Sequence, residues 1–240
     1  MSPSEVLLAT RVAGHTVTVV RYAPFQELKS HAHEEEGLTV VLQGTFLEET
    51  QRGTMLAPAG AVATRPYGLR HTNRFGSEGA VIIGVIPDRD RFGQPMSDWT
   101  WAELPAAFRA GLRLVGQDDD ALPELLAAIG PPVRSDRFIA VRARRMLEDA
   151  EHRPSVSAVA HVLDVHPVHL ARQFRKTYGV SLREYRTIRL VKRAATAILG
   201  TKTPLSRIAH DCGFADHSHM CRAFRHVAGW SPSRLRTSDN

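Results

Sequence analysis

The hydrophobic pattern of the chain changes near residue 99. Before that point, apolar residues form short alternating or β-branched runs separated by glycine and proline, which is typical of β-strands. These runs cover residues 5–22, 38–43, 45–50, 53–56, 61–65, 70–75 and 80–86. Many short strands at close spacing predict a β-sandwich or β-barrel over residues 1–98.

After residue 99 the apolar positions recur with helical spacing. The segment 99–132 is predicted to hold two short helices, over 99–115 and 122–129, and we expect it either to pair two copies of the chain or to cover the open side of the barrel. Further helices are predicted over residues 135–151, 156–163, 167–178, 182–199, 205–212 and 217–227. Residues 133–240 are therefore expected to form an all-α domain, which makes the whole chain a two-domain α+β protein.

The predicted C-terminal helices contain the same helical hairpin twice. In residues 205–236, apolar positions spaced i, i+3, i+4, i+7 form one helix face, and Gly213 ends that helix because glycine adopts the left-handed conformation without penalty. Asp216 or His217 begins the second helix, where an aspartate caps free N–H groups. A weaker copy lies about fifty residues earlier, with Asp164 in place of Gly213. The polar outer face of each second helix predicts an element that enters a DNA groove.

Charge is unevenly distributed along the chain. The net charge is −2 over residues 1–98, −3 over 99–132 and +11 over 133–240, within a total of +6. A basic C-terminal half joined to a weakly acidic N-terminal half is typical of a nucleic-acid-binding protein with a separate second domain. No run approaches the roughly 20 apolar residues of a membrane helix, and no secretory signal is evident. We expect a cytoplasmic protein with no membrane partner, whose Cys212 and Cys221 are thiols.

Histidine and glutamate side chains give the N-terminal domain its candidate chemistry. His31 and His33 project to the same face of a strand, because the side-chain period of a strand is two. By the same parity, Glu36 shares a face with Leu38, which we expect to point into the barrel. His71 begins or ends a later strand. Three imidazoles and a carboxylate that converge inside a barrel suit a divalent transition metal such as zinc, iron, manganese or nickel.

These residues resemble the cupin family, whose fold is a small double-stranded β-barrel. The first cupin motif is matched by His31, His33, Glu36 and Gly44, and the second by Gly60, Pro66, Gly68 and His71. The resemblance implies that His31, His33, Glu36 and His71 form a metal site.

Two departures from the cupin pattern leave the carboxylate open. Phe25 stands where the first motif usually begins with glycine. The spacing between His33 and Glu36 is one residue shorter than in the family, and Gly37 occupies the usual glutamate position. Glu35 is therefore an alternative ligand.

The second helical hairpin resembles the second helix-turn-helix of the AraC type of bacterial transcription regulator. The matching residues are Ile208-Ala209, Gly213-Phe214, Asp216, Ser218, 222–225, Gly229, Ser231-Pro232 and Arg236. The resemblance implies a bacterial regulator with a cupin-like N-terminal domain. Such a domain commonly binds a small organic effector and no metal, in which case the histidines would line the effector pocket.

Two recognition helices on one connecting helix can reach successive major grooves, about 34 Å apart, and so bind an asymmetric site. Arg172 and Arg222 are the first choices for base contacts, because a guanidinium matches the O6 and N7 of guanine. By position in the family motif, the other groove-facing residues are Val168, Ala171, His217, Ser218 and Cys221. Phosphate contacts are expected from Arg175, Lys176, Arg186, Arg225 and Arg234.

The sequence therefore predicts a transcription regulator that binds double-stranded DNA and is controlled by a small molecule or metal in the barrel. It is not expected to be an enzyme. The resemblance favours activation through contact with RNA polymerase, and a homodimer is expected if residues 99–132 pair two copies. Two alternatives stay open: a metal-dependent cupin enzyme fused to a DNA-binding domain, and an architectural DNA-binding protein whose barrel only dimerises.

Overall fold

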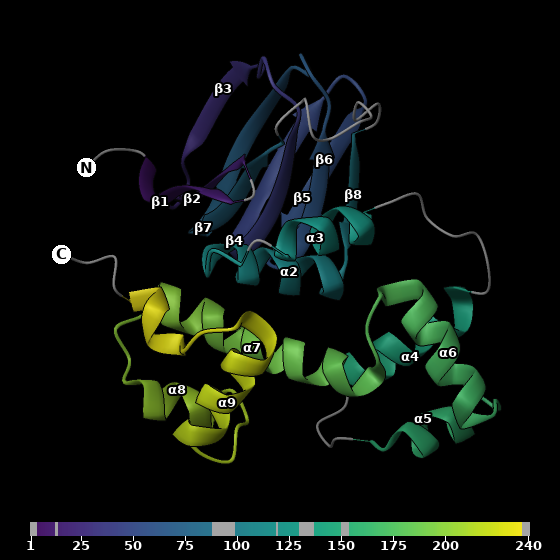
Figure 1. The fold of residues 1–240 in the computed structure, drawn as a ribbon. Coiled ribbons are helices and arrows are strands. Elements are labelled where there is room, and N and C mark those ends of the chain that lie inside the picture. Colours follow the sequence, from purple (N-terminus) through teal and green to yellow (C-terminus); the bar gives the residue numbers. More distant parts are fainter. Residues whose placement is uncertain are drawn as a thin grey trace.

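A computed structural model describes residues 4–12, 14–87, 99–118, 120–129, 137–149 and 154–236. These residues form an all-β N-terminal part and a helical C-terminal part (Figure 1), as the pattern predicted. None of the helices in the described segments is long and apolar enough to cross a membrane. Both cysteines of the described chain are free thiols.

The N-terminal part is one antiparallel sheet that folds back on itself. Its strands are β1 (Ser4–Val12), β2 (His15–Tyr22), β3 (Glu27–His31), β4 (Gly37–Thr50), β5 (Gly53–Pro58), β6 (Ala61–Arg65), β7 (His71–Ile86) and β8 (Thr100–Glu103). They are ordered β1-β2-β7-β4-β6-β8, with β3 paired to β7 and β5 paired to β4. Because β4 and β7 run through both halves of the sheet, they give it two layers that face each other.

Long, bent strands replace two pairs of predicted strands. The runs 38–43 and 45–50 are both part of β4, and the runs 70–75 and 80–86 belong to β7. Gly44, which separates the first two of these runs, is a bend in β4 with φ of +72°. A Cβ on Gly44 would lie 1.9 Å from the carbonyl oxygen of Gly79, so the two bent strands approach each other where only glycine fits.

The two faces of β4 belong to different apolar clusters. Leu38 and Val40 face outward and belong to the cluster that continues through α2 into the C-terminal helices. Val41, Phe46 and Phe75 form the second cluster, inside the barrel. The prediction that Leu38 points into the barrel is therefore wrong, because the face of β4 that was expected to point inward is covered by helices.

The helices lie where the spacing predicted them, with one exception. They are α2 (Pro105–Val115), α3 (Ala121–Ile129), α4 (Arg137–Asp149), α5 (Val156–Val162), α6 (Pro167–Tyr178), α7 (Leu182–Gly200), α8 (Leu205–Asp211) and α9 (His217–Ala228), followed by the 3-10 turn η1 (Pro232–Arg236). The start of the predicted helix over 99–115 is instead strand β8, in which Trp101 pairs with Ala63 of β6. Trp101 packs against Phe46, with ring centroids 5.6 Å apart. Burial in the barrel therefore outweighs the helical spacing of this short segment.

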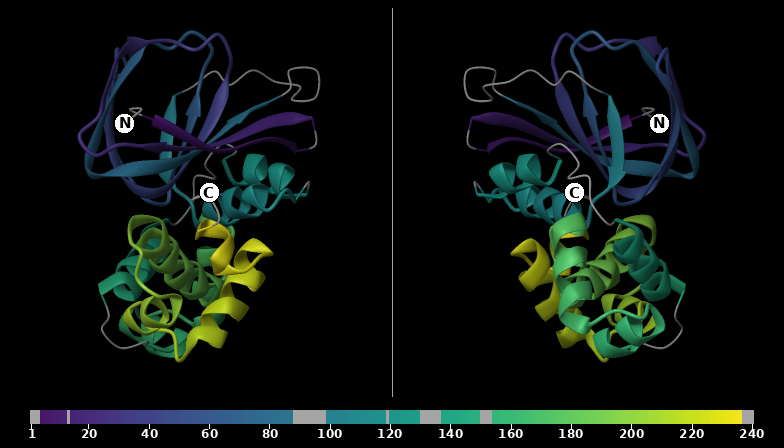
Figure 2. Two further views of the ribbon diagram at one scale, coloured as in Figure 1. Left: turned by 90° about the vertical axis from the view of Figure 1, so that its left-hand side faces the viewer. Right: turned by 90° about the vertical axis from the view of Figure 1, so that its right-hand side faces the viewer.

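Helix α2 lies between the barrel and the C-terminal helices. Figure 2 shows this in both side views, with the teal helices below the strands and above the green and yellow helices. On one side of α2, a Cβ on Gly111 would lie 3.2 Å from Val40 of β4. On the other side, the buried Trp230 indole donates a hydrogen bond of 2.9 Å to the carbonyl oxygen of Leu112. One apolar core therefore runs from the sheet through α2 into the C-terminal domain.

Candidate metal centre and nucleic-acid interface

Three histidines meet at one end of the barrel. His31 ends β3 and pairs with His71, the first residue of β7, while His33 lies in the loop after β3. Each of the three offers a ligand atom, and these atoms all lie within 4.8 Å of one another. Ring centroids are separated by 4.3 Å for His31 and His71, and by 5.2 Å for His33 and His71. Antiparallel pairing thus brings together residues that are distant in sequence.

Backbone carbonyl groups orient two of these imidazoles. The Nδ1 of His31 lies 2.8 Å from the carbonyl oxygen of Lys29, and the Nδ1 of His71 lies 3.0 Å from that of Leu69. A neutral imidazole that donates its Nδ1–H to a carbonyl group keeps the lone pair on Nε2 for a metal. Histidines that bind metals commonly donate their other ring N–H to a carbonyl group in this way, so the three imidazoles fit a divalent transition metal.

The surroundings of His33 and His71 keep these two imidazoles in the form that binds metals. The pKa of the His33 imidazole is lowered to about 4, chiefly by burial and then by the nearby charges of Arg65, His71 and His31. Burial also lowers the pKa of His71, against the hydrogen bond to the carbonyl group of Leu69. Metal ligation requires neutral imidazole, so these histidines need not lose a proton near neutral pH.

The carboxylate beside the histidines is Glu48, which sequence reasoning missed. Glu48 is 6% exposed, and its Oε1 lies 3.9 Å from Nε2 of His71. Its Oε2 accepts hydrogen bonds from the indoles of Trp99 (2.7 Å) and Trp101 (3.0 Å). Among the described residues, Glu36 is outside the group whose ligand atoms lie together, so its role as a ligand stays a prediction.

Irregular pairing in β4 explains why the sequence pointed to Glu36. The register of β4 on β7 shifts after Val41 and again before Phe46. Before the shifts, odd-numbered side chains such as Val41 point into the barrel. After them, even-numbered side chains such as Phe46 do, so Glu48 also points inward. Glu36 is counted on the even positions before the shifts, which face the helices. A glycine within a strand-like run, as at Gly44, is the sequence signal for such an irregularity.

The C-terminal domain contains the two predicted hairpins, α5–α6 and α8–α9. Their turns have φ of +53° at Asp164 and +86° at Gly213. The side chain of Ser155 caps α5, and that of Asp216 caps α9 by accepting a hydrogen bond of 2.6 Å from the backbone of His219. Figure 1 shows the hairpins at the two ends of α7. The repeat in the sequence is therefore a repeat in the structure.

The predicted DNA-contacting side chains lie on the outer faces of α6 and α9. The exposed ones are Val168, Ala171, Arg172, Arg175, Lys176, His217, Ser218, Arg222 and Arg225, and Cys221 is half-buried. Val168 is 68% exposed although its side chain is apolar, as suits a contact with a thymine methyl group. The half-buried Arg186 donates to the carbonyl oxygen of Pro154, and its phosphate contact stays a prediction.

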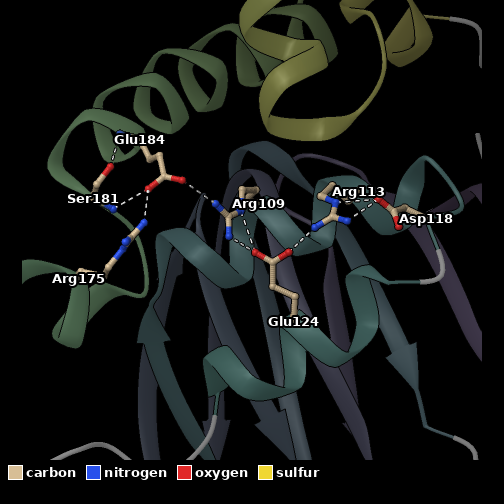
Figure 3. Close-up of polar contacts among 7 residues, drawn as sticks. All are labelled: Arg109, Arg113, Asp118, Glu124, Arg175, Ser181 and Glu184. Atoms are coloured by element: carbon tan, nitrogen blue, oxygen red, sulfur yellow. Dashed lines mark hydrogen bonds and ion pairs between the residues drawn. The ribbon is translucent and has the colours of Figure 1, made fainter.

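Ion pairs connect α2 to α6, the second helix of the first hairpin (Figure 3). Arg109 of α2 pairs with Glu124 of α3 and reaches Glu184 of α7 at 3.4 Å. Glu184 lies 3.7 Å from Arg175 of α6. Its pKa is lowered, first by the hydrogen bond from the backbone of Ser181. Arg175, a predicted phosphate contact, therefore shares a carboxylate with the helix that packs against the barrel.

A cavity of about 270 Å³ lies beside these ion pairs, between α2, α7 and α9. Both arginines that line it are already paired, since Arg113 lies 2.7 Å from Asp118 and also contacts Glu124. The charges of this cavity are therefore compensated within the protein.

Comparison with known proteins matches the two halves to different families. Residues 4–85 match the ChrR cupin-like domain, and residues 159–238 match a helix-turn-helix domain. The HTH-type transcriptional regulator YijO of Escherichia coli K12 is 33% identical over 79 residues, which are 33% of this chain and 28% of YijO. RipA of Corynebacterium glutamicum, also an HTH-type transcriptional regulator, is 32% identical over 107 residues, covering 45% of this chain and 32% of RipA.

Among solved structures, ToxT from Vibrio cholerae O395 is 12% identical, covers 93% of this chain and 97% of ToxT, and has a TM-score of 0.40. In contrast, the chain spans only about a third of the length of its regulator relatives YijO and RipA. The chain therefore joins a region similar to the ChrR cupin-like domain to a helix-turn-helix region similar to that of HTH-type transcriptional regulators.

Proposed function

We propose that this chain is a transcription regulator that binds double-stranded DNA and is controlled by a ligand or metal in its barrel. The observation that carries the proposal is the pair of matching hairpins at the ends of α7, each with an exposed basic second helix. Its relatives are themselves transcription regulators. Activation through RNA polymerase, a homodimer and a cytoplasmic location belong to the same proposal and rest on the family resemblance and the composition.

The two recognition helices present equivalent residues at equivalent positions. Arg172 is the sixth residue of α6, and Arg222 is the sixth residue of α9. Arg175 and Arg225 follow three residues later in each helix, on the same side. We assign the first pair to base edges and the second to phosphate groups, because the early part of a recognition helix lies deepest in the major groove.

Arg222→Ala is expected to weaken DNA binding by about 1–3 kcal/mol at one base-pair position and to relax the preference there. The site is first selected from random double-stranded DNA with the full chain. Affinities are then measured at one salt concentration for every single-base variant of that site, because phosphate contacts make affinity strongly salt-dependent.

Arg225→Ala is the matched control, one helical turn away on the same face. It is expected to weaken binding to all the site variants by a similar factor, since phosphate contacts carry no base preference. A uniform loss for Arg222→Ala as well would contradict its assignment to a base.

In the barrel, we propose that His31, His33 and His71 hold a divalent transition metal such as zinc, iron, manganese or nickel. Support comes from their clustered ligand atoms and from the two Nδ1 groups directed at backbone carbonyls. When bound, the metal would supply a positive centre that coordinates the oxygen atoms of an effector. The pairing of Glu48 with His71 favours Glu48 over Glu36 as the nearby carboxylate.

The path from barrel to DNA is proposed to run through α2. A ligand that shifts the sheet changes the position of α2, because Gly111 packs directly on Val40. Arg109 then moves relative to Glu184, which in turn sets how firmly Arg175 is held. Arg175 can be paired with the protein or with a DNA phosphate, so the barrel biases one arrangement over the other.

The histidine cluster also favours a second candidate function. Three histidines and a glutamate in a barrel suit a metal-dependent cupin enzyme fused to a DNA-binding domain. Turnover of candidate substrates by the metal-loaded chain tests this alternative. The relatives, all named as regulators, support control of DNA binding as the main role.

A further inference from the structure

Arg65 lies at the same end of the barrel as the three histidines. It ends β6 and pairs with Gly37, the first residue of β4. His71 pairs with Thr50, the last residue of the same strand. Arg65 is also close enough to His33 and His71 for its charge to lower the pKa of both imidazoles. The backbone hydrogen bond of 3.0 Å from Gly68 to His33 joins the loops on either side.

The guanidinium of Arg65 is folded into this mouth. Ala61 of β6 belongs to the inner apolar cluster and Val62 to the outer one, so alternation places Arg65 on the inner face. A Cβ on Gly37 would lie 2.6 Å from Nη2 of Arg65. The side chain therefore lies directly over Gly37, where any larger residue would displace it.

The donors of Arg65 are not all used within the protein. Its Nε is buried and has no hydrogen-bond partner among the described residues. Glu48 is close enough to act electrostatically on Arg65, but both indoles already donate to its Oε2. A buried N–H without a partner is unfavourable, and the planar guanidinium matches the two oxygens of a carboxylate.

We propose that the barrel binds a small organic acid whose carboxylate lies between the metal-binding histidines and the Arg65 guanidinium. The inference rests on the proposed metal site and names the chemical class of its effector. The histidines bind the metal through imidazole nitrogens, which carry no negative charge. A bound divalent metal therefore keeps its positive charge and favours an anion. Arg65 adds a second positive group at the same end of the barrel, which selects a carboxylate over a neutral sugar or amide.

The test uses oxalate as the probe and its neutral analogue oxamide as the ligand control. Calorimetric titrations are made with the full chain loaded with zinc, and zinc content is measured in the same samples. Oxalate is expected to bind the wild type at least tenfold more tightly than it binds Arg65→Gln, and oxamide is expected to bind both weakly. Arg74→Gln is the matched control, because Arg74 lies on β7 at the barrel rim with its side chain 58% exposed. It should leave oxalate affinity unchanged.

Arg65→Lys keeps the charge but loses the two-pronged donor. An intermediate affinity is expected, and this variant keeps the test valid if Arg65→Gln fails to fold. Oxalate affinity that is equal in the wild type and both Arg65 variants would overturn the inference, as would no oxalate binding by the zinc-loaded wild type. Failure of the wild type to bind zinc would instead overturn the proposed metal site. Oxalate binding that depends on Arg65 in the zinc-free chain would then still support the carboxylate site.

Discussion

Replacing Gly44 with alanine is expected to remove at least about 4 kcal/mol from the free energy of unfolding, the range of the most damaging single substitutions. The new Cβ would lie 1.9 Å from the carbonyl oxygen of Gly79 and 2.9 Å from its carbonyl carbon, which are backbone atoms that cannot rotate away. The φ of +72° at Gly44 adds strain for any L-residue with a side chain. The measurement is urea unfolding of the full chain, followed by tryptophan fluorescence.

Gly68→Ala separates the close approach from the backbone strain. Gly68 has a nearly equal φ of +68°, but a Cβ there would meet nothing within 4 Å. Its replacement should therefore cost only about 1–2 kcal/mol, the usual penalty of the left-handed conformation. Equal losses in the free energy of unfolding for the two variants would show that the close contact between Gly44 and Gly79 adds nothing to the effect of the Gly44 substitution.

His71→Ala is expected to lower the zinc affinity of the full chain by more than about 100-fold, because changes to the partners of metal ligands already cost 10–100-fold. His71 is the most buried of the three histidines, and the carbonyl group of Leu69 orients it. Competition with a chromogenic chelator measures the zinc affinity, and elemental mass spectrometry of untagged protein measures the zinc content. His161→Ala, in the exposed part of α5, is the control and should bind zinc like the wild type.

The same measurement of zinc affinity shows which glutamate lies beside the metal. Glu48→Gln is expected to weaken zinc binding and Glu36→Gln to leave it unchanged, because Glu48 is the carboxylate beside His71. No metal in the wild type or in His71→Ala, even after reconstitution, would contradict the metal site. The histidines would then line the pocket of an organic effector.

The helical hairpins could be predicted from sequence because their determinants are local. Gly213 and Asp164 mark the turns, Asp216 caps the next helix, and the apolar spacing defines the buried faces. Each of these features acts within one or two helical turns. Leu170, Phe174 and Tyr178, which share one face of α6 by this spacing, are accordingly buried.

The barrel interior could not be predicted as well because strand pairing is not local. A simple alternation through β4 places Glu36 and Glu48 on the same face, and the register shifts on β7 put them on opposite faces. Trp101 reads as helical by spacing, but pairing with Ala63 makes it part of a strand. Arg109 and Glu184 are 75 residues apart, so no sequence pattern indicates their ion pair.

The most direct test of the account is DNA affinity with the barrel in two states. The dissociation constant for the selected site is measured at fixed salt, first with the full chain treated with chelator and then with the chain loaded with zinc and oxalate. We expect a difference of about 5–150-fold for the wild type, the usual range of allosteric coupling. The difference should be lost in His71→Ala and reduced in Arg109→Gln, which breaks the link to Glu184. Equal affinity of the wild type in both states would contradict control by the barrel and favour an architectural DNA-binding protein.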